Sequence, residues 1–228
     1  MKLSVIIPSF NEEKTLFQIV EKVLNVNLEK EIIIVNDAST DKTDKVLEEI
    51  KIKFPETKIL THEKNMGKGA AIKTGLNIVS GNIVIIQDAD LELDPNDYLE
   101  LVKPIENGIS NVVFGSRELG KKNRHLYFTF YIGGKIVSMF ANFLYGSNLT
   151  DTSVGYKIFK TETLKSLNLK CNGFDFDTEV TAKILKLGNK VIEVPVNYYP
   201  RKKEDGKKIK WTDGFIALWS LLKFRFID

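Results

Sequence analysis

The chain of 228 residues is long enough to bury one sizeable core, and its 43% hydrophobic and 28% charged residues are ordinary for a globular protein. A formal net charge of +3 is too small to indicate a nucleic-acid-binding protein. The single cysteine, Cys171, excludes an internal disulfide and a zinc-cysteine cluster, which fits a reducing compartment. The sequence shows neither a signal-peptide pattern nor the roughly 18 continuous apolar residues of a membrane-spanning helix, so we expect a cytoplasmic protein.

Strand-like apolar runs alternate with helix-like periodic segments through the first part of the chain. The expected order is strand 3–7, helix 16–25, strand 31–35, helix 46–50, strand 58–60, helix 70–79 and strand 83–86. This alternation predicts an α/β protein with a mostly parallel sheet and helices on both faces. Right-handed crossovers bring successive strand ends to the same edge, so segments 8–12, 64–68 and 88–90, together with Asp37, should converge on one rim.

The last of these strands leads into a cluster of acids. Asp88 and Asp90 follow the run 83–86 and lie on the same side of an extended chain, and Glu92 joins them if the extended conformation persists. Isolated carboxylates are costly to bury, and three hard oxygen ligands suit Mg²⁺ or Mn²⁺ better than zinc. We therefore expect these acids to bind a divalent cation that bridges to substrate phosphates. The alternative is that they form an acidic surface turn.

The remaining chain alternates less regularly. We expect a short helix at 99–102, strands at 111–115 and up to 159, helices at 161–167 and 174–188, and a strand at 190–196. The aromatic segment 124–149 predicts one or two helices that either expose an apolar face to a partner or pack on the sheet. A basic run at 201–210 indicates a solvated loop, a phosphate contact or a membrane contact, and a helix at 213–226 follows it.

Several short motifs stand in an order that resembles the inverting family-two glycosyltransferases of the GT-A fold. They are Val5-Ile6-Ile7-Pro8-Ser9-Phe10-Asn11-Glu12-Glu13, Val35-Asn36-Asp37-Ala38-Ser39-Thr40-Asp41, Asn65-Met66-Gly67-Lys68-Gly69, Asp88-Ala89-Asp90 and Gly115-Ser116-Arg117, and later Asp151 with Gly155-Tyr156-Lys157, Phe176-Asp177-Thr178-Glu179, Glu193-Val194-Pro195-Val196 and Arg201 with Gly206-Lys207-Lys208-Ile209. Each motif alone is weak, but the ordered set is strong and covers nearly the whole chain. It is most similar to the branch of dolichyl-phosphate mannose synthases and polyprenyl-phosphate glucosyltransferases.

The resemblance implies a single GT-A domain with a mostly parallel sheet flanked by helices. Residues 1–115 would form a nucleotide-sugar-binding half, and residues 116–228 an acceptor-side half with a C-terminal helical region. The donor-side residues it implies are Pro8, Phe10, Glu12, Val35, Asp37, Lys68, Asp88, Ala89, Arg201, Lys207 and Lys208. Asp37 would accept hydrogen bonds from the base or ribose, unless it caps the following helix, and Lys68 would approach the donor, unless it is a solvated loop lysine.

The resemblance also implies roles around the diphosphate and the acceptor. Asp88 would contact ribose, whereas Asp90 and Glu92 would hold Mg²⁺ or Mn²⁺ on the diphosphate; many relatives have glutamine at the position of Glu92. The cations of the 201–208 segment would close on the diphosphate. Arg117 would hold an acceptor phosphate through a bidentate contact.

Two more acids, Asp151 and Asp177, complete the implied catalytic set with Asp90 and Arg117. A lipid phosphate acceptor is already ionised and needs no strong base, whereas a hydroxyl acceptor requires one. Asp151 or Asp177 would then be that base, unless these acids only cap or brace the structure. Glu179, in the same motif as Asp177, lies near the expected start of a helix, so capping that helix is the alternative to a role in the site.

The function that follows is metal-dependent, inverting transfer of a sugar from a GDP- or UDP-linked donor to a polyprenyl (dolichyl-type) phosphate at the cytoplasmic membrane face. The alternatives are transfer to a soluble saccharide or protein, and a non-catalytic nucleotide-sugar-binding module. Many lipid-phosphate transferases carry transmembrane helices after the catalytic domain, and this sequence shows none. The aromatics of 127–145 and the helix 219–226, flanked by Lys223 and Arg225, would make a peripheral membrane contact or pack in the core.

Overall fold

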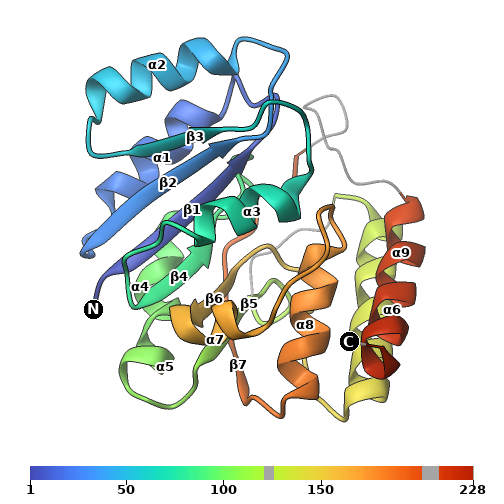
Figure 1. Cartoon of the computed structure of the whole chain (residues 1–228). Helices are drawn as coiled ribbons and strands as arrows, with labels where there is room; N and C mark the ends of the chain where they lie inside the picture. The colour runs from blue at the N-terminus through green and yellow to red at the C-terminus, as the bar shows by residue number, and fades with distance from the viewer. Residues whose placement is uncertain (121–125, 202–210, 228) are drawn as a thin grey trace.

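The computed structural model describes residues 1–120, 126–201 and 211–227, in which strands and helices alternate along the chain (Figure 1). The elements are, in order, β1 (Leu3–Ser9), α1 (Leu16–Asn25), β2 (Lys30–Asn36), α2 (Thr43–Lys53), β3 (Lys58–Thr61), α3 (Lys68–Leu76), β4 (Ile83–Ile86), the 3-10 turn η1 (Pro95–Asp97), α4 (Tyr98–Leu101), α5 (Lys103–Glu106), β5 (Val112–Ser116), α6 (Phe128–Tyr145), β6 (Lys157–Lys160), α7 (Thr161–Ser166), α8 (Phe176–Lys186), β7 (Val191–Pro195) and α9 (Trp211–Phe226). The segment 124–149 therefore contributes one helix within its described part, and α3 begins at Lys68 itself.

The strands form one seven-stranded sheet in the order β3-β2-β1-β4-β6-β5-β7. Only β6 runs antiparallel, to both β4 and β5, and the other pairs are parallel. The predicted mostly parallel sheet is thus confirmed. Successive strands move outward from β1 to β3, and β4 then pairs on the opposite side of β1, which makes the β1–β4 boundary a topological switch point. Ligands of open α/β sheets bind in the crevice at the strand ends beside such a point.

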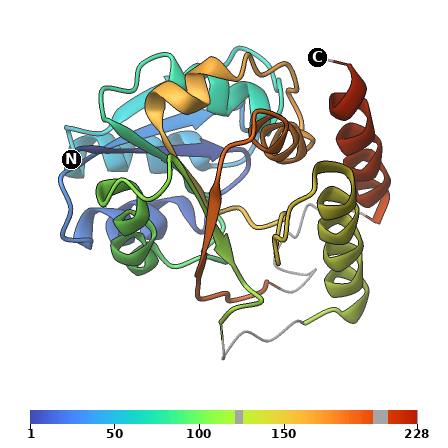
Figure 2. The same cartoon turned by 90° about the horizontal axis from the view of Figure 1, so that it is seen from below.

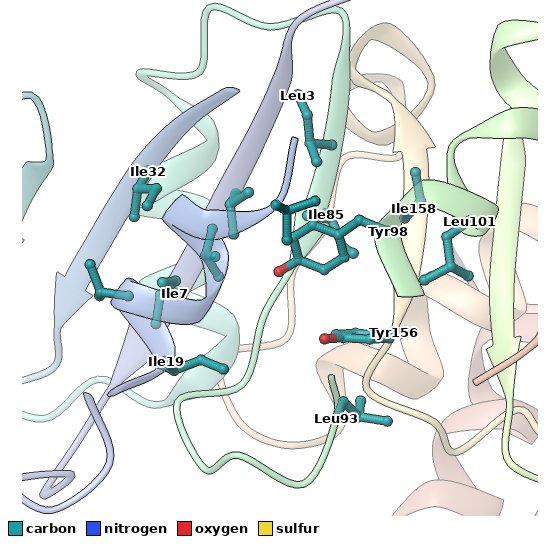
Figure 3. Packing of buried hydrophobic residues seen from close by; sticks show 14 of the residues in the cluster. Leu3, Ile7, Ile19, Ile32, Ile85, Leu93, Tyr98, Leu101, Tyr156 and Ile158 are labelled. Carbon is teal, nitrogen blue, oxygen red and sulfur yellow. The ribbon is translucent and has the colours of Figure 1, made fainter. Parts of the chain in front are cut away.

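Helices cover both faces of the sheet, as the alternation along β1 shows. Leu3, Val5 and Ile7 face a core shared with α1, α2, α4 and α5, whereas Ile6 faces a second core shared with α3, α7 and α8. Figure 3 shows the first core, which includes Ile85 of β4 and the rings of Tyr98 and Tyr156, whose centroids are 5.7 Å apart. Fully buried aliphatic runs are what a strand covered on both faces requires.

A buried polar group fixes the carboxyl end of β4. The hydroxyls of Tyr98 and Tyr156 lie 2.5 and 2.7 Å from Oε1 of Gln87, and Nε2 of Gln87 donates to the carbonyl oxygen of Asp88 at 2.9 Å. Burial raises the pKa of both tyrosines well above its usual value, so the two hydroxyls remain donors. This network holds the backbone where the acid cluster begins.

Glu31 of β2 makes a second buried polar centre, which predicts a pH-dependent stability. Burial alone would raise its pKa, but hydrogen bonds from Lys58, Ser4 and Ser80 lower the value to about 2. The folded state therefore keeps the carboxylate ionised below the pH at which the unfolded chain protonates, and this stability is lost as the pH falls from about 4.5 towards 2.

We expect Glu31→Gln to lower the free energy of unfolding at pH 7 by about 2 kcal/mol, because charge-assisted hydrogen bonds are lost. The variant should also lose the pH dependence between about 4.5 and 2, which urea titrations across that range measure. Glu21→Gln is the matched control, because the 2.7 Å ion pair of Glu21 with Lys53 is exposed to solvent. Parallel acid profiles for wild type and Glu31→Gln would contradict the prediction.

α6 and α9 lie side by side on the part of the molecule remote from α1 and α2, and both views show them beside α8 (Figures 1 and 2). A small cluster of Val137, Ala141, Ala182, Leu221 and Phe224 joins the three helices. The outward faces of α6 and α9 carry large exposed apolar side chains. Within the described residues, none of the helices has the length and hydropathy needed to cross a membrane.

Candidate active site

A cleft of about 1380 Å³ opens at the carboxyl ends of β1, β2 and β4 and continues along α6 and α9. The predicted site residues that line it are Pro8, Phe10, Glu12, Asp37, Lys68, Asp88, Ala89, Asp90, Glu92, Arg117, Asp151, Asp177 and Arg201. Val35 does not line it, because its side chain is fully buried between β2 and α3. Lys207 and Lys208 lie outside the described residues. The structure thus brings residues from both halves of the chain around one cavity.

Asp37 organises the loop that carries Lys68. Its carboxylate lies 2.7 Å from Nδ1 of His62 and accepts the backbone N–H groups of Met66 and Gly67 at 2.8 and 2.7 Å. Gly67 has a φ of +96°, and a Cβ there would collide with the carbonyl oxygen of Asn172, so only glycine fits this approach. Asp37 does not cap α2, whose N-cap is Lys42 without a side-chain bond. Its carboxylate therefore anchors the 65–67 loop from the floor of the cleft.

Four charges of alternating sign contact one another in turn, and three of them, Asp88, Lys68 and Asp177, line the cleft. Nζ of Lys68 lies 2.8 Å from Oδ1 of Asp88 and 3.2 Å from Oδ2 of Asp177, whose other oxygen lies 3.3 Å from Nζ of Lys157. Burial would lower the pKa of Lys68, but the charges of Asp177 and Asp88 raise it above its usual value. Lys68 is thus a fixed cation at the start of α3 and not a solvated loop lysine. A fixed cation at this place suits an anionic ligand.

Asp90 and Glu92 gather around a different cation, Arg201. One Nη of Arg201 lies 2.9 Å from Oδ2 of Asp90 and the other 3.7 Å from Oε2 of Glu12, while the backbone N–H of Arg201 donates to Glu92 at 2.9 Å. The extended conformation does not persist here: β4 ends at Ile86, and Leu91 has a left-handed φ of +62°. The condition under which Glu92 would share the phase of Asp88 and Asp90 is therefore not met, and Asp88 pairs with Lys68.

The acids around Arg201 fit a divalent cation that is completed by a ligand. Among the described residues, no group of three or more acid, histidine or cysteine side chains is assembled to hold a metal ion. Mg²⁺, however, is usually bound by one or two carboxylates plus substrate phosphates. Burial and the charges of Asp88 and Glu92 raise the pKa of Asp90 to about 7, although Arg201 lowers it, so a further cation at this place would favour the ionised carboxylate.

Arg117, directly after β5, and Asp151 form a fork-to-fork pair in the lining of the cleft. Nε and Nη2 of Arg117 lie 2.7 and 2.8 Å from the two oxygens of Asp151, and the guanidinium lies 5.1 Å above the ring of Tyr198. Glu193 of β7 accepts the backbone N–H groups of Thr150 and Asp151 at 2.8 and 3.0 Å and so holds the loop in place. Burial would raise the pKa of Asp151, but Arg117 lowers it below its usual value. Asp151 is therefore a carboxylate that orients Arg117.

Asp177 is held in the same way, between two lysines. Burial acts to raise its pKa, but Lys157 and Lys68 lower it. Neither acid considered as a general base thus has the raised pKa that suits a proton acceptor near neutral pH. Glu179, the third acid of this helix start, is turned away from the cleft: it accepts the backbone N–H groups of Lys170 and Cys171 and pairs with Lys183.

Some supporting residues were not predicted from the sequence. Lys157 and Glu193 belong to motifs that were noted for their resemblance, but a charged residue in a strand gives no sign of which side chain it will meet. Gly155 has a clearer reason: a Cβ at this position would collide with Oδ2 of Asp88. The Gly155-Tyr156-Lys157 segment therefore touches Asp88, Gln87 and Asp177 in turn.

A family model described as glycosyl transferase family 2 matches residues 4–167 of the chain. A dolichyl-phosphate beta-glucosyltransferase of Trichomonas vaginalis is 31% identical over 232 residues, which cover 95% of this chain and 70% of that protein. A UDP-N-acetylglucosamine–dolichyl-phosphate N-acetylglucosaminyltransferase of Methanococcus voltae is 30% identical over 239 residues, 97% and 95% of the two chains. The chain belongs to glycosyl transferase family 2, and it is a glycosyltransferase, as the resemblance predicted.

Solved structures confirm the GT-A fold. Glucosyl-3-phosphoglycerate synthase from Mycobacterium tuberculosis in complex with UDP superposes with a TM-score of 0.74 at 18% identity, covering all of this chain and 81% of that one. The same synthase with Mn²⁺, UDP and phosphoglyceric acid gives a TM-score of 0.70 at 19% identity, covering 100% and 79% of the two chains. At this identity, the likeness shows the fold alone.

Proposed function

We propose that the protein is a metal-dependent, inverting glycosyltransferase that moves a sugar from a nucleoside-diphosphate donor, UDP- or GDP-linked, to a polyprenyl phosphate at the cytoplasmic membrane face. The observation that carries this proposal is that both acids available as a general base, Asp151 and Asp177, are held by cations. An acceptor that needs no deprotonation therefore suits the site best. A phosphate monoester is such an acceptor, and the relatives from Trichomonas and Methanococcus are named for dolichyl phosphate.

The donor half of the cleft supplies the groups that a nucleoside diphosphate needs. Pro8, near the end of β1, and Phe10, directly after β1, line the cleft and would pack against the base, whereas Lys68 would supply a cation for the diphosphate. Asp90 and Glu92 would hold Mg²⁺ or Mn²⁺, which when bound neutralises charge on the departing phosphates. Arg201 lies among these acids and within reach of the same phosphates.

On the side of the cleft proposed for the acceptor, Arg117 would supply a cation, and residues of α6 and α9 line the same cleft. Arg117 is oriented by Asp151 and Tyr198, and a guanidinium fork suits a phosphate better than an ammonium group does. The cleft lining contributed by the α6 and α9 region contains aromatic and small residues, together with polar ones such as Thr129, Lys135 and Asp213. The aromatic, aliphatic and glycine residues of this lining include Tyr127, Phe130, Gly133, Gly134, Gly214 and Ile216. An isoprenoid chain fits the apolar part of this lining, whereas a soluble sugar would leave it unused.

A screen of nucleotide sugars by thermal shift, with and without Mn²⁺, tests the donor proposal, because a ligand that binds only the folded state raises the unfolding temperature. We expect stabilisation by one UDP- or GDP-linked sugar that depends on Mn²⁺. Transfer assays with radiolabelled donor and a short polyprenyl phosphate then test the acceptor. A labelled soluble saccharide or protein would support the alternative acceptors, and donor binding without release of nucleoside diphosphate would indicate a non-catalytic module.

The exposed apolar faces of α6 and α9 support contact with the membrane that holds the acceptor. Phe128, Met139 and Phe143 of α6 and Trp219 and Phe226 of α9 each expose between 65% and 83% of their surface. Lys223 and Arg225 lie in the last turn of α9, where they suit an anionic lipid surface. Other side chains of α6 and α9, such as Phe130 and Ile216, line the cleft, so a lipid phosphate would reach Arg117 from a membrane bound at these two helices.

We expect Met139→Glu/Phe143→Glu to weaken binding to phosphatidylglycerol–phosphatidylcholine vesicles by at least about tenfold, because two apolar side chains no longer enter the bilayer. Cosedimentation measures this binding, and the unfolding temperature should not change, since both side chains are exposed. Ile52→Glu is the matched control: Ile52 is 83% exposed on α2, remote from α6. Equal vesicle binding by wild type and the double variant would refute the membrane contact.

A further inference from the structure

Lys157 is the most deeply buried charge beside the cleft, and the proposed function does not use it. Its side chain is fully buried at the start of β6. Nζ donates to the carbonyl oxygen of Val154 at 2.8 Å, lies 3.3 Å from Oδ1 of Asp177, and sits 5.2 Å from the centre of the Phe114 ring. Together, these three contacts hold the ammonium group of Lys157 in one place.

Stability alone does not explain a lysine at this position. Replacing a buried ion pair by well-packed apolar residues is often neutral or stabilising, because the desolvation of a charge is costly. Burial accordingly lowers the pKa of Lys157, although Asp177 acts against this. Unlike an apolar side chain, Lys157 orients the carboxylate of Asp177 through their ion pair.

The position of Lys157 makes it a rigid support. β6 lies between β4 and β5, and Lys157 pairs with Phe114 in the register of β5. Asp177, by contrast, stands in the first turn of α8, on one face of the sheet. The pair of Lys157 and Asp177 therefore links the start of α8, where Asp177 lines the cleft, to an inner strand of the sheet.

We propose that Lys157 is a positioning residue for the donor: through Asp177 it fixes the ammonium group of Lys68 between two carboxylates, facing the bound diphosphate. With Lys157 present, Asp177 divides its two oxygens between two lysines. Without Lys157, the whole charge of Asp177 acts on Lys68 and draws it away from Asp88. This inference rests on the proposed function, because it assumes that the cleft binds a nucleoside diphosphate.

The test is calorimetric binding of UDP and of GDP, each with Mn²⁺, to the full chain. In Lys157→Met, we expect the affinity for the nucleotide that wild type binds to fall at least about tenfold, and kcat to fall with it, because small displacements of a charged group are costly in a site. Lys183→Met is the matched control: Lys183 is also buried, pairs with Glu179 of the same helix at 3.1 Å, and does not line the cleft.

A second variant, Lys157→Met/Asp177→Asn, separates positioning from plain stability and remains informative if the single variant fails to fold. It removes both charges of the pair, so the unfolding temperature should rise again from that of Lys157→Met. Nucleotide affinity should stay low, because Lys68 then has only the carboxylate of Asp88 beside it. Affinity in Lys157→Met equal to that in Lys183→Met, or recovery of affinity together with stability in the double variant, would overturn the inference. Wild type that binds neither nucleotide would overturn the donor proposal as well, and this distinguishes the two failures.

Discussion

Replacing Asp90 with asparagine is expected to lower kcat/KM for sugar transfer by about 10³-fold, comparable to the loss of one group that stabilises a developing charge. The expectation follows from the group of three acids, Glu12, Asp90 and Glu92, that surrounds the guanidinium of Arg201. The variant should also lose the additional thermal stabilisation that Mn²⁺ gives in the presence of the nucleotide. Initial rates at several Mn²⁺ concentrations, together with thermal shifts, measure both effects.

The same substitution should not destabilise the metal-free protein near neutral pH. The folded state holds the proton of Asp90 up to a pKa of about 7, above the usual value of 3.8, so wild type loses stability as the pH rises between these values. Asparagine removes that loss, and we expect its unfolding temperature at pH 8 to equal or exceed that of wild type.

Asp94→Asn is the control for Asp90→Asn. Asp94 caps η1 through the backbone N–H of Asn96 at 3.1 Å, a bond that asparagine can also accept, and it does not line the cleft. Its activity should stay within about twofold of wild type. Transfer by Asp90→Asn at the wild-type rate would remove Asp90, and the metal it is proposed to hold, from the reaction.

The sheet could be predicted from the sequence because its strands are short runs of buried aliphatic residues between helical patterns. Ile83–Ile86 and Leu3–Ile7 fit only a strand covered on both faces, and the strand–helix alternation then determines a common edge. The convergence of Pro8, Asp37 and Asp88 on one cleft follows from that edge and is confirmed by the structure. The period of the hydrophobic pattern and the order of strands and helices are therefore enough to predict the sheet and the edge at which the cleft lies.

Side-chain pairing could not be predicted in the same way. The chain leaves the extended conformation after β4 ends at Ile86, and Leu91 adopts a left-handed φ that no residue type in this segment predicts, so Glu92 does not continue the alternation of Asp88 and Asp90. Arg201 reaches those acids from more than a hundred residues away, so no local pattern connects them. The resemblance supplied the residues of the site, whereas the partners of each charge depend on tertiary contacts.

Arg117→Lys is expected to reduce transfer to a polyprenyl phosphate by about 10²- to 10³-fold, mostly through a higher KM for the acceptor. Lysine keeps the charge but cannot form the two parallel hydrogen bonds to Asp151 or lie flat above Tyr198. Asp151 would be left buried with fewer donors, so we also expect a lower unfolding temperature. A detergent-solubilised short-chain acceptor lets KM and kcat be measured without a membrane.

Arg225→Lys serves as the control for Arg117→Lys, because the guanidinium of Arg225 also lies over a tyrosine ring, that of Tyr145 at 5.7 Å, but outside the cleft. Its kinetics in detergent should match wild type. The companion variant Asp151→Asn distinguishes the two roles of that acid. If Asp151 only orients Arg117, the rate falls while the acid limb of the pH–rate profile stays where it was; loss of that limb would identify Asp151 as a general base and favour a hydroxyl acceptor.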